Sequence, residues 1–199
     1  MKIVLLDTLT FGETDLSAFD SLGEVEVFKT TSPEQTLSRI TTADVIVTNK
    51  VVITKEMKTT CTKLKLICVA ATGMNNVDLE AAKNLHVEVK NVAGYSTDSV
   101  IQHTFSMLFY LMGHSRYYDE YVKEGSYSRS PIFTDVSKPF FEIKGKKWGV
   151  IGLGSIGRGV ANIAKTFGAD VFYYSTSGVN RDEEFQRTTL DNLLKTCDI

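Results

Sequence analysis

The sequence has 199 residues, of which 43% are hydrophobic and 23% are charged, and its formal net charge is -2. This composition is ordinary for a globular protein with one large or two small domains. The chain has no excess of basic residues, so a nucleic-acid partner is not expected. No apolar run approaches the roughly 20 residues that span a bilayer, and residues 1–10 lack the pattern of a signal peptide. We expect a cytoplasmic protein that binds small molecules and no membrane.

The cysteines give no indication of a metal site or a disulfide framework. Cys61, Cys68 and Cys197 are too few and too scattered for either. We expect them to be reduced and to fill small apolar spaces, and we expect no bound metal.

The first half of the chain alternates short runs rich in Val and Ile with amphipathic stretches, which is typical of a parallel sheet covered by helices. Ser32 followed by Pro33 predicts a helix start, because serine caps helices and proline suits the first helical position. Residues 77–85 predict a short alanine-rich helix. The expected strands are residues 3–6, 25–28, 45–48, 66–70 and 87–92. Residues 1 to about 96 therefore predict one small α/β unit.

Residues 98–114 predict a helix with almost no polar face. Such a helix must be buried on several sides, either against a second domain or against a second subunit. After it, residues 125–139 are rich in Ser and turn residues and predict a loop.

A second α/β unit is expected to begin at a buried strand, residues 148–151, followed by a helical segment that ends near Phe167. Another strand is expected at 171–174 and another amphipathic segment at 190–195. A third strand is expected to begin at 197–199, where the sequence ends. A doubly wound nucleotide domain needs about six strands. The sequence is therefore expected to hold less than half of one.

A G-x-G-x-x-G pattern lies between the strand and the helix of this second unit. The pattern alone is weak evidence, but here it has a strand before it and a helix after it. Gly152 would permit a tight turn, Gly154 would let the backbone approach a pyrophosphate, and Gly157 would let the helix pack on the strand. The amides at the helix start, at Ser155 and Ile156, would face the phosphates. The alternative is a sharp turn that binds no ligand.

The end of the next strand is the expected contact for the adenosine ribose. An acidic residue about 20 positions after the motif usually accepts the ribose hydrogen bonds, and it would repel a 2'-phosphate. Hydroxyl residues, among them Ser175 and Thr176, take this place, and the next carboxylate is Asp182. Arg181 would be a phosphate partner if its loop folds back, and a solvated loop arginine is the alternative. The predicted cofactor is therefore NAD or NADP.

With this order of elements, the sequence resembles the D-isomer-specific 2-hydroxyacid dehydrogenases over essentially its whole length. The resemblance rests on residues 70–78, on residues 91–97 with the Ser-Val and Gln-His-Thr that follow, and on residues 152–157. The Gly-Tyr-Ser-Thr and Gln-His-Thr sequences are most similar to the glycerate dehydrogenase or hydroxypyruvate reductase branch. The resemblance implies a flavodoxin-like substrate-binding domain over residues 1–97. It also implies a Rossmann dinucleotide-binding domain over residues 98–199, incomplete at its C-terminus.

The resemblance implies an oxidoreductase that transfers a hydride between NAD(P) and C2 of a small D-2-hydroxy or 2-oxo acid, with NAD slightly favoured. The loop at Thr72 and Gly73 would offer backbone amides to the substrate carboxylate, and an ordinary β-to-α turn is the alternative. Val100 and Thr104, near the start of the apolar helix, would contact the nicotinamide end of the cofactor in a cleft between the domains. A homodimer that uses this helix is expected.

None of the family's catalytic residues can be carried over onto this sequence. Family members use an arginine that holds the substrate, and a histidine acid or base oriented by a glutamate, all in the part of the fold that follows Ile199. His86, His103 and His114 lie before the glycine pattern, and we expect them to be packing or helix-end residues. The sequence is therefore expected to be the N-terminal part of a longer enzyme.

Two other functions remain open at this point. A protein of the same fold could bind the dinucleotide and report its occupancy to a protein partner, or the chain could be an inactive fragment that only dimerises. A catalytic histidine and glutamate in the intact chain would distinguish an enzyme from a sensor. The side chain of the substrate is not specified by these residues.

Overall fold

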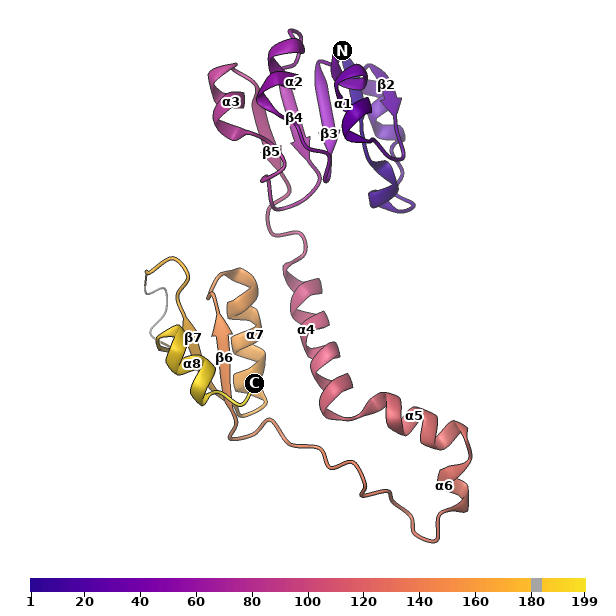
Figure 1. Ribbon diagram of the computed structural model, residues 1–199, viewed down its shortest axis with the longest axis vertical. Coiled ribbons are helices and arrows are strands. Elements are labelled where there is room, and N and C mark those ends of the chain that lie inside the picture. The colour runs from indigo at the N-terminus through magenta and orange to yellow at the C-terminus, as the bar shows by residue number, and fades with distance from the viewer. Residues whose placement is uncertain (180–183) are drawn as a thin grey trace. The chain divides into compact units, whose positions relative to one another are not determined.

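The structure is a computed structural model that describes residues 1–179 and 184–199, and it divides into two compact units, Met1–Tyr95 and Ser96–Ile199. Each unit contains a parallel sheet with helices, which confirms the predicted α/β class (Figure 1). Arg181 and Asp182, considered above as neighbours of a cofactor, lie outside the described residues. Among the described residues, no helix is both long enough and apolar enough to cross a membrane.

The first unit is a five-stranded parallel sheet in the order β2-β1-β3-β4-β5. This is the strand order of flavodoxin-like folds, as predicted. Every strand end lies within one residue of its expected position, because the runs of Val and Ile that favour strands are short and well bounded. The strands are β1 (Lys2–Leu5), β2 (Glu24–Val27), β3 (Val45–Thr48), β4 (Leu66–Val69) and β5 (Glu88–Asn91).

The two faces of this sheet are covered differently, because successive side chains of a strand point to opposite faces. The α-helices pack on the face that carries Val4, Ile46 and Ile67, and the 3-10 helices pack on the face that carries Ile3 and Leu5. The α-helices are α1 (Pro33–Ile40), α2 (Lys55–Thr60) and α3 (Leu79–Asn84), and the 3-10 helices are η1 (Thr8–Phe11) and η2 (Ser17–Leu22).

Capping residues determine where α1 and α3 begin. α1 begins at Pro33 as predicted, and the Ser32 N–H donates to Oε1 of Gln35 at 3.1 Å. α3 begins two residues later than the predicted position 77, because the Asp78 carboxylate accepts the Ala81 N–H at 2.9 Å and caps the helix there.

The second unit contains a three-stranded parallel sheet in the order β6-β7-β8. Its third described strand is Gln186–Arg187, not the predicted segment 197–199, whose backbone hydrogen bonds to β6 without forming a strand. The predicted loop 125–139 also contains a short helix, Ser126–Arg129. The elements of this unit are β6 (Lys147–Ile151), β7 (Asp170–Tyr174), β8 (Gln186–Arg187), α4 (Thr97–Met112), α5 (Ser115–Lys123), α6 (Ser126–Arg129), α7 (Ser155–Thr166) and α8 (Leu190–Thr196).

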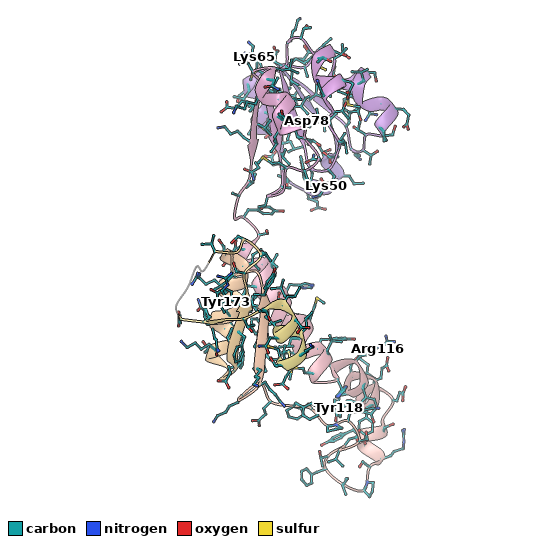
Figure 2. The ribbon with its side chains drawn as sticks, turned by 60° about the vertical axis from the view of Figure 1, so that its left-hand side comes forward. Lys50, Lys65, Asp78, Arg116, Tyr118 and Tyr173 are labelled. Atoms are coloured by element: carbon teal, nitrogen blue, oxygen red, sulfur yellow. The ribbon has the colours of Figure 1, made fainter. Side chains whose placement is uncertain are left out.

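The core of the second unit forms where α4 and α7 meet the sheet. Phe105 of α4 stacks on Trp148 of β6, with ring centroids 5.4 Å apart. Ile101 of α4 fits over Gly159 of α7, where an added Cβ would lie 2.1 Å from Ile101 Cδ1. Tyr173 of β7 is fully buried in the same core (Figure 2). Gly159, which has no side chain, therefore lets α4 and α7 approach closely.

Within the second unit the apolar helix is buried on one side, and its predicted burial by a second domain or a second subunit stays a prediction. Ile101 and Phe105 are the residues of α4 that are buried, whereas Met107 is 53% exposed, Tyr110 49% and Leu111 66%. α7 and Trp148 of β6 pack on the face of α4 that carries Ile101 and Phe105, and Leu108 and Met112 pack partly against the same core. The exposed apolar side chains named above are uncovered in this unit.

The stacking of Phe105 on Trp148 predicts a large effect of truncation. Phe105→Ala should lower the free energy of unfolding of the second unit by about 3–5 kcal/mol, because it removes a buried ring and leaves a cavity. Ser106→Ala, at the exposed neighbour on the same helix, should change it by no more than about 0.5 kcal/mol. Urea unfolding followed by Trp148 fluorescence measures both variants. Equal stability of the two variants would contradict this packing.

Candidate functional site

Residues 152–154 form a tight turn between β6 and α7. Gly152 has a φ of 88°, which lies in the left-handed region that side chains disfavour. Its N–H donates to the Tyr174 carbonyl at 2.9 Å and joins the turn to the end of β7. Gly157, in the first turn of α7, lies against the Gly152 carbonyl, and an added Cβ would be 2.0 Å from that oxygen. The end of the strand and the start of the helix are therefore in backbone contact.

The space beside Gly154 is open. An added Cβ at this N-cap residue would meet no atom within 4 Å. In the described ranges, the N–H groups of Ser155, Ile156 and Gly157 have no hydrogen-bond acceptor, as is usual for the first turn of a helix. Because the helix dipole adds partial positive charge at this end, the turn presents unpaired donors that suit an anion.

A hollow of about 110 Å³ lies beside this turn. Ser175 is buried in its wall, and its hydroxyl donates to the Val179 carbonyl at 2.6 Å. The Thr176 side chain lies 3.6 Å from the place that a Gly152 Cβ would occupy. The structure thus brings Ser175 and Thr176 next to the glycine turn. The lining residues are Leu153, Gly154, Tyr173, Ser175, Thr176, Ser177 and Val179.

These features fit a dinucleotide. A diphosphate needs close access to backbone N–H groups, which the open space at Gly154 gives, and a ribose needs hydrogen-bonding partners, which the hydroxyls at the end of β7 supply. Ser177, the last of the hydroxyl residues that the sequence places at the end of this strand, also lines the hollow. It follows Ser175 and Thr176 directly, so the run of hydroxyl residues was the signal for it.

Thr72 and Gly73 follow β4 at its carboxyl end in the first unit. The Thr72 hydroxyl donates to the Val92 carbonyl at 3.1 Å, and the Asn91 amide donates to the Thr72 carbonyl at 2.6 Å. Both bonds fix the loop against the end of β5. Both loop residues are exposed, and no described group accepts their backbone N–H groups. A fixed loop with two adjacent free donors can hold a carboxylate.

Val100 and Thr104 lie in the first half of α4, where Val100 is 40% exposed. The Thr104 hydroxyl donates to the Val100 carbonyl at 2.8 Å, so this bond is internal to the helix. The contact of these two residues with a nicotinamide stays a prediction.

The three histidines are far from the glycine turn in the sequence. His103 is exposed on α4, and His86 follows the end of α3 with a φ of 55°. His114 precedes α5 with a φ of 48°, and its Nε2 lies 3.1 Å from the Pro139 carbonyl. No group of His, Cys, Asp or Glu in the part of the chain that the structure covers is placed to hold a metal.

The first unit contains a larger hollow of about 530 Å³ that the sequence reasoning missed. Asp7, which follows β1, is buried there, and its carboxylate accepts the N–H groups of Asn49 at 2.8 Å and Lys50 at 2.7 Å. These bonds fix the loop after β3, and Lys50 of this loop, labelled in Figure 2, lines the hollow. A lone aspartate directly after the first strand was the available signal.

Comparison with known proteins agrees with this geometry. Residues 3–198 match the family described as D-isomer specific 2-hydroxyacid dehydrogenase, catalytic domain. The chain therefore belongs to the D-isomer specific 2-hydroxyacid dehydrogenase family, and the resemblance indicated by the sequence is confirmed. A hydroxypyruvate reductase from Blautia hydrogenotrophica is 34% identical to it over 206 residues, which cover 100% of this chain and 64% of that relative. The chain thus spans slightly less than two thirds of that relative's length.

Two solved structures share the fold. An acyclic imino acid reductase in complex with NADPH and D-Arg has a TM-score of 0.83 and 28% identity, over 100% of this chain and 63% of that one. A D-lactate dehydrogenase from Aquifex aeolicus, complexed with NAD and lactic acid, has a TM-score of 0.81 and 25% identity, over 100% of this chain and 59% of that one.

The backbone contact at Gly157 and the open space at Gly154 predict unequal effects on stability when one methyl group is added at each position. Gly157→Ala should lower the free energy of unfolding by about 1–3 kcal/mol or more, since its Cβ would overlap a carbonyl oxygen that belongs to the backbone. Gly154→Ala should change it by no more than about 1 kcal/mol, the cost of alanine at an N-cap. Thermal and urea unfolding of the two variants measure this difference. Equal losses would contradict the close approach at Gly157.

Proposed function

We propose that the protein is an NAD(P)-dependent oxidoreductase that interconverts a small D-2-hydroxy acid and its 2-oxo acid, of the glycerate and hydroxypyruvate kind. The observation that carries the proposal is the glycine turn, with backbone contact at Gly157, open space at Gly154 and unpaired N–H groups at the start of α7. Membership of the family supports the reaction type. The name of the hydroxypyruvate reductase relative supports the substrate class.

The proposed cofactor is NAD or NADP, as bound in the two solved structures compared above. When bound, the nicotinamide supplies the hydride carrier of the reaction. The N–H groups of Ser155, Ile156 and Gly157 would hold the diphosphate, and Ser175 and Thr176 would lie beside the adenosine ribose. Val100 and Thr104 of α4 remain the proposed contacts for the nicotinamide end.

The proposed role of the first unit is substrate binding, and that of the second is cofactor binding. The free N–H groups of Thr72 and Gly73 would hold the substrate carboxylate. We assign no residue of this chain as the catalytic acid or base or as the arginine that holds the substrate carbonyl. The proposed setting is the cytoplasm, where Cys61 and the other thiols stay reduced.

We also propose a homodimer that covers the exposed face of α4. Met107, Tyr110 and Leu111 form a continuous stretch of exposed apolar side chains on this helix, and large exposed apolar patches mark interaction sites. A second copy of the chain would bring an identical patch and bury both.

The cofactor proposal predicts that the chain binds NADH or NADPH with one molecule per chain, measured by isothermal titration calorimetry. Gly154→Ala should fold normally and weaken binding at least about tenfold, because its methyl group would occupy the space that the diphosphate needs. Ser38→Ala, at an exposed position of α1 in the first unit, is the control and should leave affinity unchanged. Unaltered affinity in Gly154→Ala would reject this site.

Turnover then distinguishes an enzyme from a protein that only senses the dinucleotide. The natural polypeptide, purified from the cells that make it, should oxidise NADH or NADPH in the presence of hydroxypyruvate or glyoxylate. Tight cofactor binding with no turnover on a panel of 2-oxo acids would favour the sensor and reject the enzyme.

The dimer proposal predicts that Leu111→Ser raises the dimer dissociation constant at least about tenfold, because a buried leucine contributes about 1.5–3 kcal/mol. Leu194→Ser is the matched control, since Leu194 of α8 is also 66% exposed. Phe105, buried within the chain, is unsuitable for this test. Sedimentation equilibrium of the chain and both variants measures the constants. A monomeric parent chain, or equal effects of the two substitutions, would contradict the proposal.

A further inference from the structure

The hollow of about 530 Å³ in the first unit lies where the strand order of the sheet reverses. The chain runs from β1 to β2 on one side of β1 and then crosses to β3 on the other side. The hollow is lined by Asp7 after β1, by Lys29 after β2 and by Lys50 after β3. Doubly wound folds bind ligands at the carboxyl ends of strands beside such a reversal. The fold therefore places this hollow at a position that suits a ligand.

The three loops around the hollow are tied to one another by hydrogen bonds. The Leu9 N–H donates to the Lys29 carbonyl at 3.0 Å and joins the loop after β1 to the loop after β2. The buried Asp7 carboxylate joins the loop after β1 to the loop after β3 through the N–H groups of Asn49 and Lys50. The walls of the hollow are thus fixed before a ligand arrives, which reduces the entropy cost of binding.

The walls of the hollow are largely apolar. Its apolar lining residues are Leu9, Pro33, Val51, Val52 and Met57, and threonines also line it. Leu9 and Val52 are exposed although they are apolar, and burying such side chains against an apolar ligand is favourable. The volume falls within the range of roughly 300–1,000 Å³ that is usual for small-molecule sites. These walls suit the apolar body of an organic molecule.

The charges at the hollow favour an anion. Lys29 and Lys50 both line it and are exposed, and neither forms an ion pair with any residue that the structure describes. Asp7 is the acidic residue among the lining residues, and both of its carboxylate oxygens already accept backbone N–H groups. Glu34, in the first turn of α1, accepts the Ser32 hydroxyl at 2.6 Å and does not line the hollow. Two ammonium groups therefore remain for a ligand.

We infer that this hollow is a second small-molecule site, which binds a monocarboxylate with an apolar body. Lys29 and Lys50 would hold the carboxylate, and the apolar walls would contact the body of the ligand. The site differs from the loop at Thr72 and Gly73, which follows β4 and lines no part of the hollow. The inference goes beyond the proposed reaction, whose 2-oxo acids are small and polar, and does not depend on it.

The test compares 2-naphthoate with its uncharged analogue 2-naphthamide by isothermal titration calorimetry on the full chain without cofactor. The parent chain should bind the carboxylate at least about fivefold more tightly than the amide, as expected for ion pairs at exposed lysines. Lys29→Gln combined with Lys50→Gln should make the two affinities equal. Lys63→Gln combined with Lys65→Gln is the matched control, with the same change of charge at exposed lysines of the same unit. Lys65 precedes β4, whereas Lys50 follows β3, so the two labelled side chains mark opposite ends of the sheet (Figure 2).

The position of the bound ligand is measured by NMR of the ¹⁵N-labelled chain. Addition of 2-naphthoate should shift the amide signals of Leu9, Val51 and Val52 and leave those of Thr72 and Gly73 unchanged. Absence of binding, equal affinity of the parent chain for the acid and the amide, or a preference that survives in the variant of both lining lysines would overturn the inference. Displacement of 2-naphthoate by glyoxylate in the presence of NAD would place it at the substrate loop and also overturn the second site. Each of these outcomes leaves the proposed dinucleotide binding intact.

Discussion

The contact between Gly157 and the carbonyl of Gly152 is the constraint on which the second unit depends. An added Cβ would lie 2.0 Å from that oxygen, so the start of α7 can approach the end of β6 only because residue 157 has no side chain. This approach leaves the first N–H groups of the helix beside an open space at Gly154. The packing of strand on helix and the proposed binding of a diphosphate therefore have the same origin.

Both units present their functional groups at the carboxyl ends of parallel strands, where ligands of α/β proteins usually bind. In the first unit, the loop after β4 is held by Asn91 and Val92 and offers two free amides. In the second unit, the Gly152 N–H joins the glycine turn to the end of β7. In each case backbone bonds from a neighbouring strand fix the loop, and a fixed loop loses little entropy when it binds a ligand.

The fold was largely predictable from sequence, because short runs of β-branched residues and capping residues such as Ser32 act locally. β8 was not predictable, since it has two residues and exists by pairing with β7. The partner that covers Leu111 was not predictable either, because an apolar pattern shows which faces avoid water and not which partner covers them. The glycine turn was found because its spacing and its flanking elements are local.

The most direct test of this account is to follow the backbone amides of the glycine turn by NMR while NAD or NADP is added to the ¹⁵N-labelled chain. The account predicts that the amide signals of Ser155, Ile156 and Gly157 shift most strongly and downfield, because each gains a hydrogen bond to phosphate oxygen. Shifts confined to other parts of the chain, with these amides unchanged under saturating ligand, would contradict it.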